Sequence, residues 1–339
     1  MSPILRDLGE REITRTILPK YTQGIGDDCA AISTNGDSIV ATTDPVPEPA
    51  AKLIGGDPDL YWVGWLLVTI NASDLAAAGA TPLGFLSALE CPSDTDVSAF
   101  ERLLEGIRDS CVNEGMPYIG GNLREGNKLT GVGTAIGITR GRKPLTRSGA
   151  RAGDVLVSIG HGGHFWRDAL LVSEKKESVE KRVSPLYSPR SQIQAMAALR
   201  QGGYVNAAID NSDGLLPTLT QLAEVNRCRI LLFADQLTVP GADRVGVSPS
   251  RLWLGWGDWN VIASIPNDKV EAAKQLASEH EFVLTTIGSI ECGAPEVFIV
   301  RPEKRLAAPR LESERFAKDS WFTVGLHRYI ELLKEVDVG

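Results

Sequence analysis

The chain has 339 residues, of which 43% are hydrophobic and 23% are charged. This balance is typical of a globular protein with room for two domains, and it excludes a disordered chain and a coiled coil. The formal net charge of −8 argues against a general nucleic-acid binder and against an anionic membrane surface, so we expect neither as a partner.

Cysteine usage indicates a cytoplasmic protein. The cysteines are odd in number and widely spread, without the C-x-x-C pair of a zinc site or the even count of a disulfide framework: Cys29, Cys91, Cys111, Cys228 and Cys292. The charged N-terminus has no apolar core, so no signal peptide is expected. The most apolar stretch, 60–70, is too short to span a bilayer.

Strand-like runs alternate with helices in the N-terminal half. Strands are predicted at Ser38–Thr43, Leu83–Leu89 and Leu129–Thr139. The helix Tyr61–Ala78 is apolar on nearly every side and stops at Gly79, so we expect it to be deeply buried. The helix Val97–Asn113 is amphipathic, with Asp96 as its predicted N-cap.

A basic, glycine-rich connector at Arg140–Asp154 separates this half from a second alternating series. The second series is predicted to contain strands Val155–Ile159, Ile230–Phe233, Val261–Ile265, Phe282–Ile287 and Glu296–Val300, and helices Arg167–Glu174, Ser191–Arg200, Leu215–Asn226 and Lys269–His280. The predicted class is therefore α/β (α+β), with domains at 1–147 and 148–305 and a C-terminal tail at 306–339.

Several aspartates stand where a carboxylate is costly. Asp27 and Asp28 follow a glycine turn and precede an apolar run, and Asp44 closes a predicted strand. Asp74 lies inside the all-apolar helix with no basic residue within one turn, where an unpaired buried carboxylate costs several kcal/mol. Asp210 is followed three residues later by Asp213, just before a helix. Each of them except Asp74 is also explained as an ordinary cap or turn residue.

A divalent cation would relieve the cost of Asp74. Several oxygen ligands without histidine or cysteine suit Mg²⁺, which usually accompanies phosphate. The chain has no P-loop, dinucleotide-binding or protein-kinase signature. It does have Gly120-Gly121-Asn122, where a backbone can approach a ligand closely, and Arg147, which is either a bidentate polyphosphate clamp or a solvated connector charge.

Taken in order, these segments resemble the thiamine-monophosphate kinase family of the PurM-like superfamily, which also contains aminoimidazole ribonucleotide (AIR) synthetase. The matching segments are GIGDDCAAI, ATTD, NASDLAAAGATP, GGN, TRSGARAGD and DNSDGL, with a weaker match in GWGDWNVIASI. The resemblance covers residues 20–290 and implies a PurM-like fold that dimerises through its N-terminal sheets. ATP and several Mg²⁺ ions would lie between the two domains.

The resemblance also assigns residues. By position, the metal ligands are Asp28, Thr42, Thr43, Asp44, Asp74, Asp210 and Asp213, and the nucleotide contacts are Gly121, Asn122, Arg147 and Ser212. The catalytic set is Asp74, Asp213 and Arg147. The acceptor side is predicted to include Ala51, Asp258, Trp259, Asn260 and His327, the last from the C-terminal tail.

The departures from the family pattern concentrate on the acceptor side. The family usually has an aspartate where this chain has Asn122, which lowers the charge of the site. The family's His-Phe pair after TTD is missing from the segment DPVPEPAA, and its Gly-Glu-Asp-Tyr-Glu segment reads Trp256-Gly257-Asp258-Trp259-Asn260. The nucleotide half is therefore largely kept, while the acceptor half is rewritten.

Some features remain open to two interpretations. Trp253, Trp256 and Trp259 either offer a stacking surface for an aromatic or cationic ligand or pack a glycine-rich loop. His161 and His164 form a strand-to-helix turn, with a metal or phosphate role as the alternative. Cys29 as a nucleophile is disfavoured because no histidine is near in sequence.

Three functions follow from these observations. The leading one is a Mg²⁺- and ATP-dependent kinase for a small metabolite, with thiamine phosphate as the named acceptor. The second is an AIR synthetase-like ligase that activates an amide or carboxylate oxygen with ATP. The third is a non-catalytic nucleotide-binding regulator. The product discriminates them: a phosphorylated metabolite, free phosphate with a condensed product, or binding without turnover.

Overall fold

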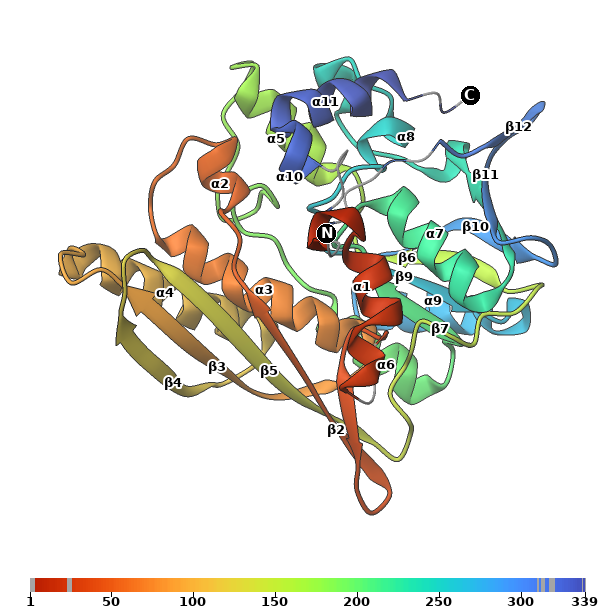
Figure 1. The fold of residues 1–339 in the computed structure, drawn as a ribbon. Helices are drawn as coiled ribbons and strands as arrows, with labels where there is room; N and C mark the ends of the chain where they lie inside the picture. Colours follow the sequence, from red (N-terminus) through yellow and green to blue (C-terminus); the bar gives the residue numbers. More distant parts are fainter. Residues whose placement is uncertain are drawn as a thin grey trace.

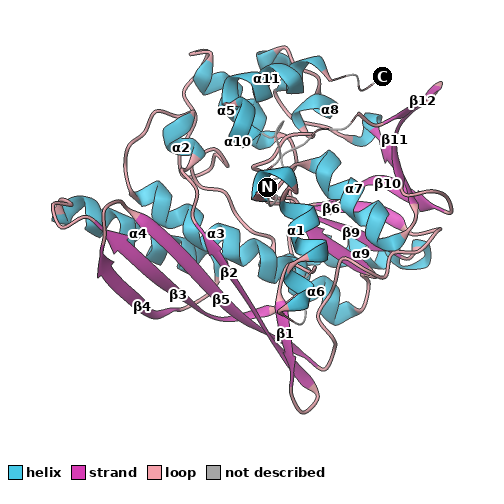
Figure 2. Ribbon diagram, in the orientation of Figure 1, coloured by secondary structure: helices cyan, strands magenta, loops and turns pink. Residues whose placement is uncertain are grey.

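The computed structural model describes residues 4–22, 26–309, 311, 315–316, 321–336 and 338. In this part of the chain the fold is α/β, as predicted, and is built on two separate sheets (Figures 1 and 2). None of the described helices is long and apolar enough to cross a membrane.

The N-terminal sheet has five strands in the order β1-β2-β5-β3-β4, and only the β3–β4 pair is parallel. The strands are β1 (Ala30–Ser33), β2 (Asp37–Pro45), β3 (Thr81–Cys91), β4 (Tyr118–Glu125) and β5 (Thr130–Arg140). The helices α3 (Tyr61–Ala77) and α4 (Val97–Glu114) cover one face of this sheet (Figure 1). Along β5 every second residue is buried, as expected for a strand with a helix layer on one side.

Helix α3 lies between the two halves of the molecule. Every residue of α3 except Asp74 is buried, because the helix packs against β2 and β5 on one side and against α6 (Ile193–Gly202) and β7 (Ala207–Asp210) on the other. Its apolar sequence on all sides thus reflects two contact surfaces. The helix ends at Ala77, and Gly79, two residues further on, turns the chain away with a left-handed φ of 65°. Asp74 is thereby carried to the boundary between the two sheets.

The C-terminal sheet has seven strands in the order β12-β11-β8-β10-β6-β9-β7, with β8 and β11 parallel and the other pairs antiparallel. The remaining strands are β6 (Val155–Ile159), β8 (Arg229–Phe233), β9 (Val261–Ile265), β10 (Leu284–Glu291), β11 (Glu296–Arg301) and β12 (Lys304–Ala307). The other helices are α1 (Glu10–Thr16), α2 (Ala50–Leu53), α5 (His164–Ser173), α7 (Leu215–Asn226), α8 (Pro249–Leu252), α9 (Val270–Glu279), α10 (Trp321–Val324) and α11 (Leu326–Glu335).

Most predicted elements are confirmed, three of them with unchanged bounds: β6, α7 and β9. Asp96 caps α4 as predicted, since its carboxylate accepts the N–H groups of Ser98 and Ala99. Strand β4 was not predicted, and it contains the segment Gly120-Gly121-Asn122. A Cβ on Gly121 would lie 1.8 Å from the carbonyl oxygen of Ser87, so this glycine is required by the β3–β4 pairing itself.

Candidate active site between the two sheets

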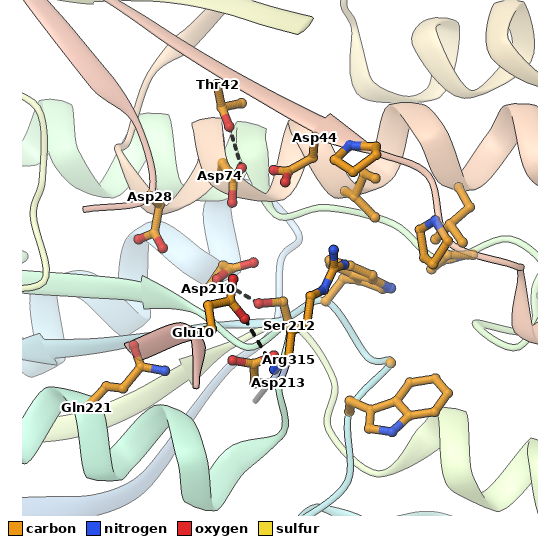
Figure 3. Close-up of a pocket in the computed structure, with 18 of the residues that line it drawn as sticks. Glu10, Asp28, Thr42, Asp44, Asp74, Asp210, Ser212, Asp213, Gln221 and Arg315 are labelled. Atoms are coloured by element: carbon orange, nitrogen blue, oxygen red, sulfur yellow. Dashed lines mark hydrogen bonds between the residues drawn. The ribbon is translucent and has the colours of Figure 1, made fainter. Parts of the chain in front are cut away.

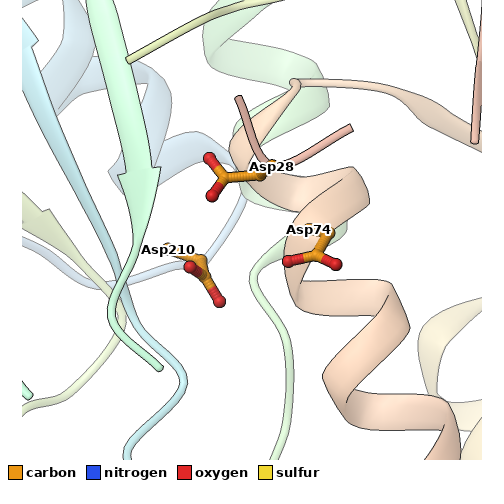
Figure 4. Close-up of side chains that lie close together, drawn as sticks. All are labelled: Asp28, Asp74 and Asp210. Carbon is orange, nitrogen blue, oxygen red and sulfur yellow. The ribbon is translucent and has the colours of Figure 1, made fainter. Parts of the chain in front are cut away.

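Three carboxylates from distant segments meet at the boundary between the sheets. One carboxylate oxygen from each of Asp28, Asp74 and Asp210 lies within 4.8 Å of the others (Figure 4). Asp28 precedes β1, Asp74 projects from α3, and Asp210 is the last residue of β7. All-oxygen clusters of this kind suit hard divalent cations such as Mg²⁺.

Hydroxyl groups hold these carboxylates in place. Thr42 on β2 donates a hydrogen bond of 2.5 Å to Asp74 (Figure 3). Ser73 and Ser212 each donate to Asp210, at 3.2 Å. The N-terminal and C-terminal halves of the chain therefore both contribute carboxylates and supporting hydrogen bonds to one cluster.

The cluster is electrostatically unfavourable by itself. Burial raises the pKa of Asp74 well above its usual range, and the charges of Asp210, Asp44 and Asp28 raise it further. Burial, followed by the charge of Asp28, raises the pKa of Asp210 to about 8. Burial also raises the pKa of Asp28, although Arg147 opposes this shift. Buried like charges of this kind are stabilised by a bound cation or by protons.

Two further aspartates extend the cluster. The backbone N–H of Asp44 donates to the side-chain oxygen of Asn71 at 3.1 Å, which orients the end of β2. Burial raises the pKa of Asp213 to about 6, and the charge of Glu10 adds to this shift. Thr43 donates its hydroxyl to the carbonyl of Gly133 at 2.9 Å, so its oxygen stays at the same strand end.

Arg147 is neither a solvated connector charge nor an unengaged cation. Its Nη2 and Nε atoms donate to one oxygen of Asp28 at 2.5 and 3.1 Å, and its Nη1 donates to Gln221 at 3.1 Å. The Asp28 side chain is 5% exposed. The guanidinium therefore neutralises one carboxylate of the cluster and ties it to α7.

A pocket of about 780 Å³ opens over the acidic cluster (Figure 3). One part of its lining is polar, with more carboxylates than arginines: Glu10, Arg11, Thr14, Arg15, Asp27, Asp28, Thr42, Thr43, Asp44, Glu48, Asp74, Arg147, Asp210, Ser212, Asp213, Gln221, Glu224 and Arg315. The other part is apolar and aromatic: Pro45, Pro47, Pro49, Leu66, Ile70, Phe165, Leu186, Tyr187, Pro189, Trp256 and Trp259. A ligand with an anionic end and a flat apolar end fits this division.

The structure brings together ten of the predicted site residues in this lining: Asp28, Thr42, Thr43, Asp44, Asp74, Arg147, Asp210, Ser212, Asp213 and Trp259. Asp258 and Asn260 lie outside it. Both oxygens of Asp258 accept backbone N–H groups, from Gly163 at 2.6 Å and Phe165 at 2.8 Å, so this carboxylate caps α5. Asn260 is fully buried and donates to the hydroxyl of Ser158. Their positions therefore do not support the predicted acceptor contacts.

Four other predicted residues also lie outside the pocket lining of a single chain. Ala51 is fully buried in α2, and His327 is exposed on α11. Gly121 and Asn122 lie on β4, which is separated from β2 by β5 and β3. Three interstrand steps amount to about 14 Å, so these two residues lie well away from the predicted ligands Thr42, Thr43 and Asp44 on β2 of their own chain.

The remaining candidates are now distinguished. The His161 and His164 rings stack with centroids 4.4 Å apart, but within the described ranges the metal-type cluster found is the aspartate one. Trp253 is a packing residue whose indole N–H donates to the carbonyl of Thr238. Burial raises the pKa of the Cys29 thiol, and neighbouring aspartates raise it further, which opposes a nucleophilic role.

The pocket also contains residues that the sequence did not single out. Glu10 and Arg11 come from α1, Gln221 from α7 and Arg315 from the segment after β12. Gln221 lies about two helical turns beyond Asp213. Residues at that spacing share one face of a helix, so the spacing is a weak indication that Gln221 is near Asp213. No local pattern marks Arg315, because only the folded chain brings it to the pocket.

Comparison with known protein families defines the fold class of this chain. The model of the AIR synthase related protein N-terminal domain matches residues 26–139, and that of the C-terminal domain matches residues 151–301. Together with the two sheets and the acidic cluster between them, these matches identify the PurM-like two-domain fold.

The relatives narrow this class. A thiamine-monophosphate kinase of Methanopyrus kandleri is 31% identical over 83% of this chain and 87% of its own length. That of Mycobacterium tuberculosis is 30% identical over 86% and 85%. A solved structure described as AaThiL complexed with AMPPCP and TMP is 25% identical, with a TM-score of 0.75, over 91% of this chain and 99% of that chain. The chain belongs to the thiamine-monophosphate kinase family.

Proposed function

We propose that this protein is an ATP-dependent thiamine-monophosphate kinase, which transfers the γ-phosphoryl group of ATP to thiamine monophosphate and releases thiamine diphosphate and ADP. The observation that carries the proposal is the cluster of Asp28, Asp74 and Asp210, within 4.8 Å of one another, at the acidic end of a pocket whose other end is apolar. Family membership supports the same reaction.

The carboxylates fit Mg²⁺. Burial and mutual repulsion raise the pKa of Asp74 and Asp210, a cost that a divalent cation would remove. We assign Asp28, Asp74 and Asp210 as the central ligands and place Asp44, Asp213, Thr42 and Thr43 around them. When bound, Mg²⁺ neutralises phosphate oxygens and orients them for displacement.

The chain's own residues contribute to the transfer by positioning the nucleotide and the acceptor. Arg147 and Ser212 are assigned to the nucleotide phosphates, and Arg147 also holds Asp28 in place. The acceptor is a phosphate whose oxygen is already ionised, so in-line attack on the γ-phosphorus needs no general base. The apolar end of the pocket excludes water, which limits wasteful hydrolysis of ATP.

The acceptor ring is assigned to the apolar end. Prolines 45, 47 and 49 stand in the segment where the family's histidine is missing, and all three line the pocket. Trp259 is held there with a positive φ of 54°, and Trp256 packs against Tyr329 of α11 with ring centroids 6.3 Å apart. A cationic heteroaromatic ring such as that of thiamine is suited to such a surface.

We further propose that two copies of the chain associate through the outer face of the N-terminal sheet. That face carries exposed or half-exposed apolar side chains, which isolated proteins seldom gather on one surface: Ile32, Leu86, Ile119, Val132, Ile136 and Ile138. Pairing would bring Gly121 and Asn122 of one copy toward the second copy. The assigned domains are 1–147 and 148–305, with the tail 306–339 behind the acceptor end, in a cytoplasmic protein.

The test is product identification by mass spectrometry after incubation with Mg²⁺, ATP and thiamine monophosphate. We expect thiamine diphosphate at an enzymatic rate, and none when EDTA replaces Mg²⁺. Free phosphate with a condensed product would favour the ligase instead. Binding of Mg·ATP without turnover of any acceptor would favour the regulator, and either result would overturn the proposal.

A further inference from the structure

Two segments outside both matched domains meet at the pocket. Helix α1 precedes residue 26, where the first match begins, and Arg315 follows residue 301, where the second match ends. The backbone N–H of Glu10 donates to the carbonyl of Arg315 at 3.1 Å. In return, the N–H of Arg315 donates to the Glu10 carboxylate at 3.2 Å. The two chain ends thus form one wall of the pocket beside Asp213 (Figure 3).

The charge of Arg315 acts on both halves of the acidic cluster. Burial raises the pKa of Asp44, on β2, and of Asp213, just after β7, and the charge of Arg315 opposes the shift at both carboxyl groups. Arg315 is an exposed residue of the pocket lining, so a ligand in the pocket can reach it. Arg147 already holds Asp28 and Gln221 and is less exposed.

A nucleotide bound at this cluster would present several anionic oxygens along its phosphate chain. The γ-phosphoryl group carries charge on three equatorial oxygens during transfer, and a planar guanidinium matches two of them. Carboxylates outnumber the arginines of the lining, which are Arg11, Arg15, Arg147 and Arg315. Arg15 pairs with Glu12 and Arg147 with Asp28, whereas Arg315 is fixed by its backbone beside Asp213, where its guanidinium can approach these oxygens.

We propose that Arg315 contacts the γ-phosphoryl group of the bound nucleotide and is a catalytic residue, and that Glu10 is the positioning residue that holds it. This inference rests on the proposed kinase function for the transfer step. In that step an oxygen of the acceptor phosphate forms a bond to the γ-phosphorus. The bond from that phosphorus to the bridging oxygen breaks, and ADP leaves with the electron pair. Arg315 keeps its protons and only donates hydrogen bonds.

A binding measurement tests the contact without requiring turnover. The affinities for Mg·AMPPCP and Mg·ADP are measured by titration calorimetry for the wild type, Arg315→Ala and Arg315→Lys. We expect the wild type to prefer the triphosphate analogue and Arg315→Ala to lose about 10-fold or more of that preference, the scale of a hydrogen bond to a charged group. Arg315→Lys keeps part of the preference, because it retains the charge but not the fork.

A matched control is Arg328→Ala, which removes an exposed arginine that pairs with Glu331 on α11. It should leave the preference unchanged. An unaltered preference in Arg315→Ala overturns the inference, whatever the acceptor is. If the wild type makes no thiamine diphosphate but Arg315→Ala still loses the preference, the proposed function fails and the phosphate contact remains.

Turnover separates a catalytic role from a structural one. With thiamine monophosphate as acceptor, we expect kcat of Arg315→Ala to fall about 100- to 1,000-fold with little change in the acceptor KM. Glu10→Ala should lower kcat less, and the double variant should be no slower than Arg315→Ala alone. A raised acceptor KM with unchanged kcat would contradict the contact with the transferred group. Additive losses would contradict the role of Glu10.

Discussion

Replacing Asp74 by asparagine should make the metal-free protein more stable while removing its activity. Asp74 has two carboxylate neighbours, Asp28 and Asp210, with oxygens within 4.8 Å. Two unit charges at that distance repel by about 3–4 kcal/mol at an effective dielectric constant of 20. Partial protonation already relieves some of this repulsion, so we expect Asp74→Asn to gain about 1–3 kcal/mol at pH 8.

The pH dependence has a defined sign. Because the native state raises the pKa of Asp74, the native state binds more protons than the unfolded state above the usual range of a carboxyl group. The stability of the metal-free wild type therefore falls as the pH rises through the raised pKa. Asp74→Asn removes this loss, so its advantage in EDTA should be larger at pH 8 than at pH 6.

The assay is thermal unfolding in EDTA and in excess Mg²⁺, together with phosphoryl transfer. For a chain of this size, we expect Tm to rise by about 2–6 °C in EDTA, while Mg²⁺ stabilises the variant much less than the wild type. Transfer should fall at least about 1,000-fold. Asp168→Asn is the control, because Asp168 accepts hydrogen bonds from Arg167 and Ser184, so its loss should lower Tm. A lower Tm for Asp74→Asn in EDTA, or equal stabilisation by Mg²⁺, would refute the reasoning.

Three further variants test other parts of the account. Burial raises the pKa of Asp258 to about 7, so its contribution to the free energy of unfolding, up to about 4 kcal/mol, is lost as the pH rises from 4 through 7. Asp258→Asn should remove this pH dependence in urea unfolding measured at several pH values. An unchanged pH dependence counts against the reasoning. Arg147→Met leaves Asp28 buried without its partner, so the free energy of unfolding in EDTA should fall by about 2–4 kcal/mol, with a lower Tm. An unchanged Tm would show that this ion pair does not stabilise the fold. Val132→Arg places a charge on the outer apolar face of the N-terminal sheet, so sedimentation should change from a two-chain to a one-chain mass. A wild type that already sediments as one chain contradicts the association.

The local parts of the fold follow from local sequence patterns. The all-apolar pattern of α3 predicts its deep burial, which the structure confirms, and the cost of Asp74 within that pattern is the reason for predicting a cation beside it. Strand β4 escapes prediction because two consecutive glycines are typical of a loop. Gly121 is required there because a side chain would collide with the backbone of β3, a constraint that appears only once the strands are paired.

The site residues also divide into those that local sequence reveals and those that only the folded chain brings together. Aspartates that are costly where they stand can be found from sequence, since the cost is set by their immediate neighbours. Asp258 illustrates the limit: its motif assigns it to the acceptor side, whereas the folded chain uses both of its oxygens to cap α5. Glu10 and Arg315 meet across 305 residues, and no local pattern records that contact. Position near the ends of the chain gives no indication of proximity to the pocket.

The most direct measurement is the phosphorus balance of a single reaction, followed by ³¹P NMR with Mg²⁺, ATP and thiamine monophosphate. The account predicts that thiamine diphosphate and ADP appear in equal amounts while thiamine monophosphate disappears at the same rate, with almost no inorganic phosphate. The carboxylate cluster would then serve direct transfer between two phosphates. Inorganic phosphate appearing with ADP, while thiamine monophosphate stays constant, would contradict the central claim.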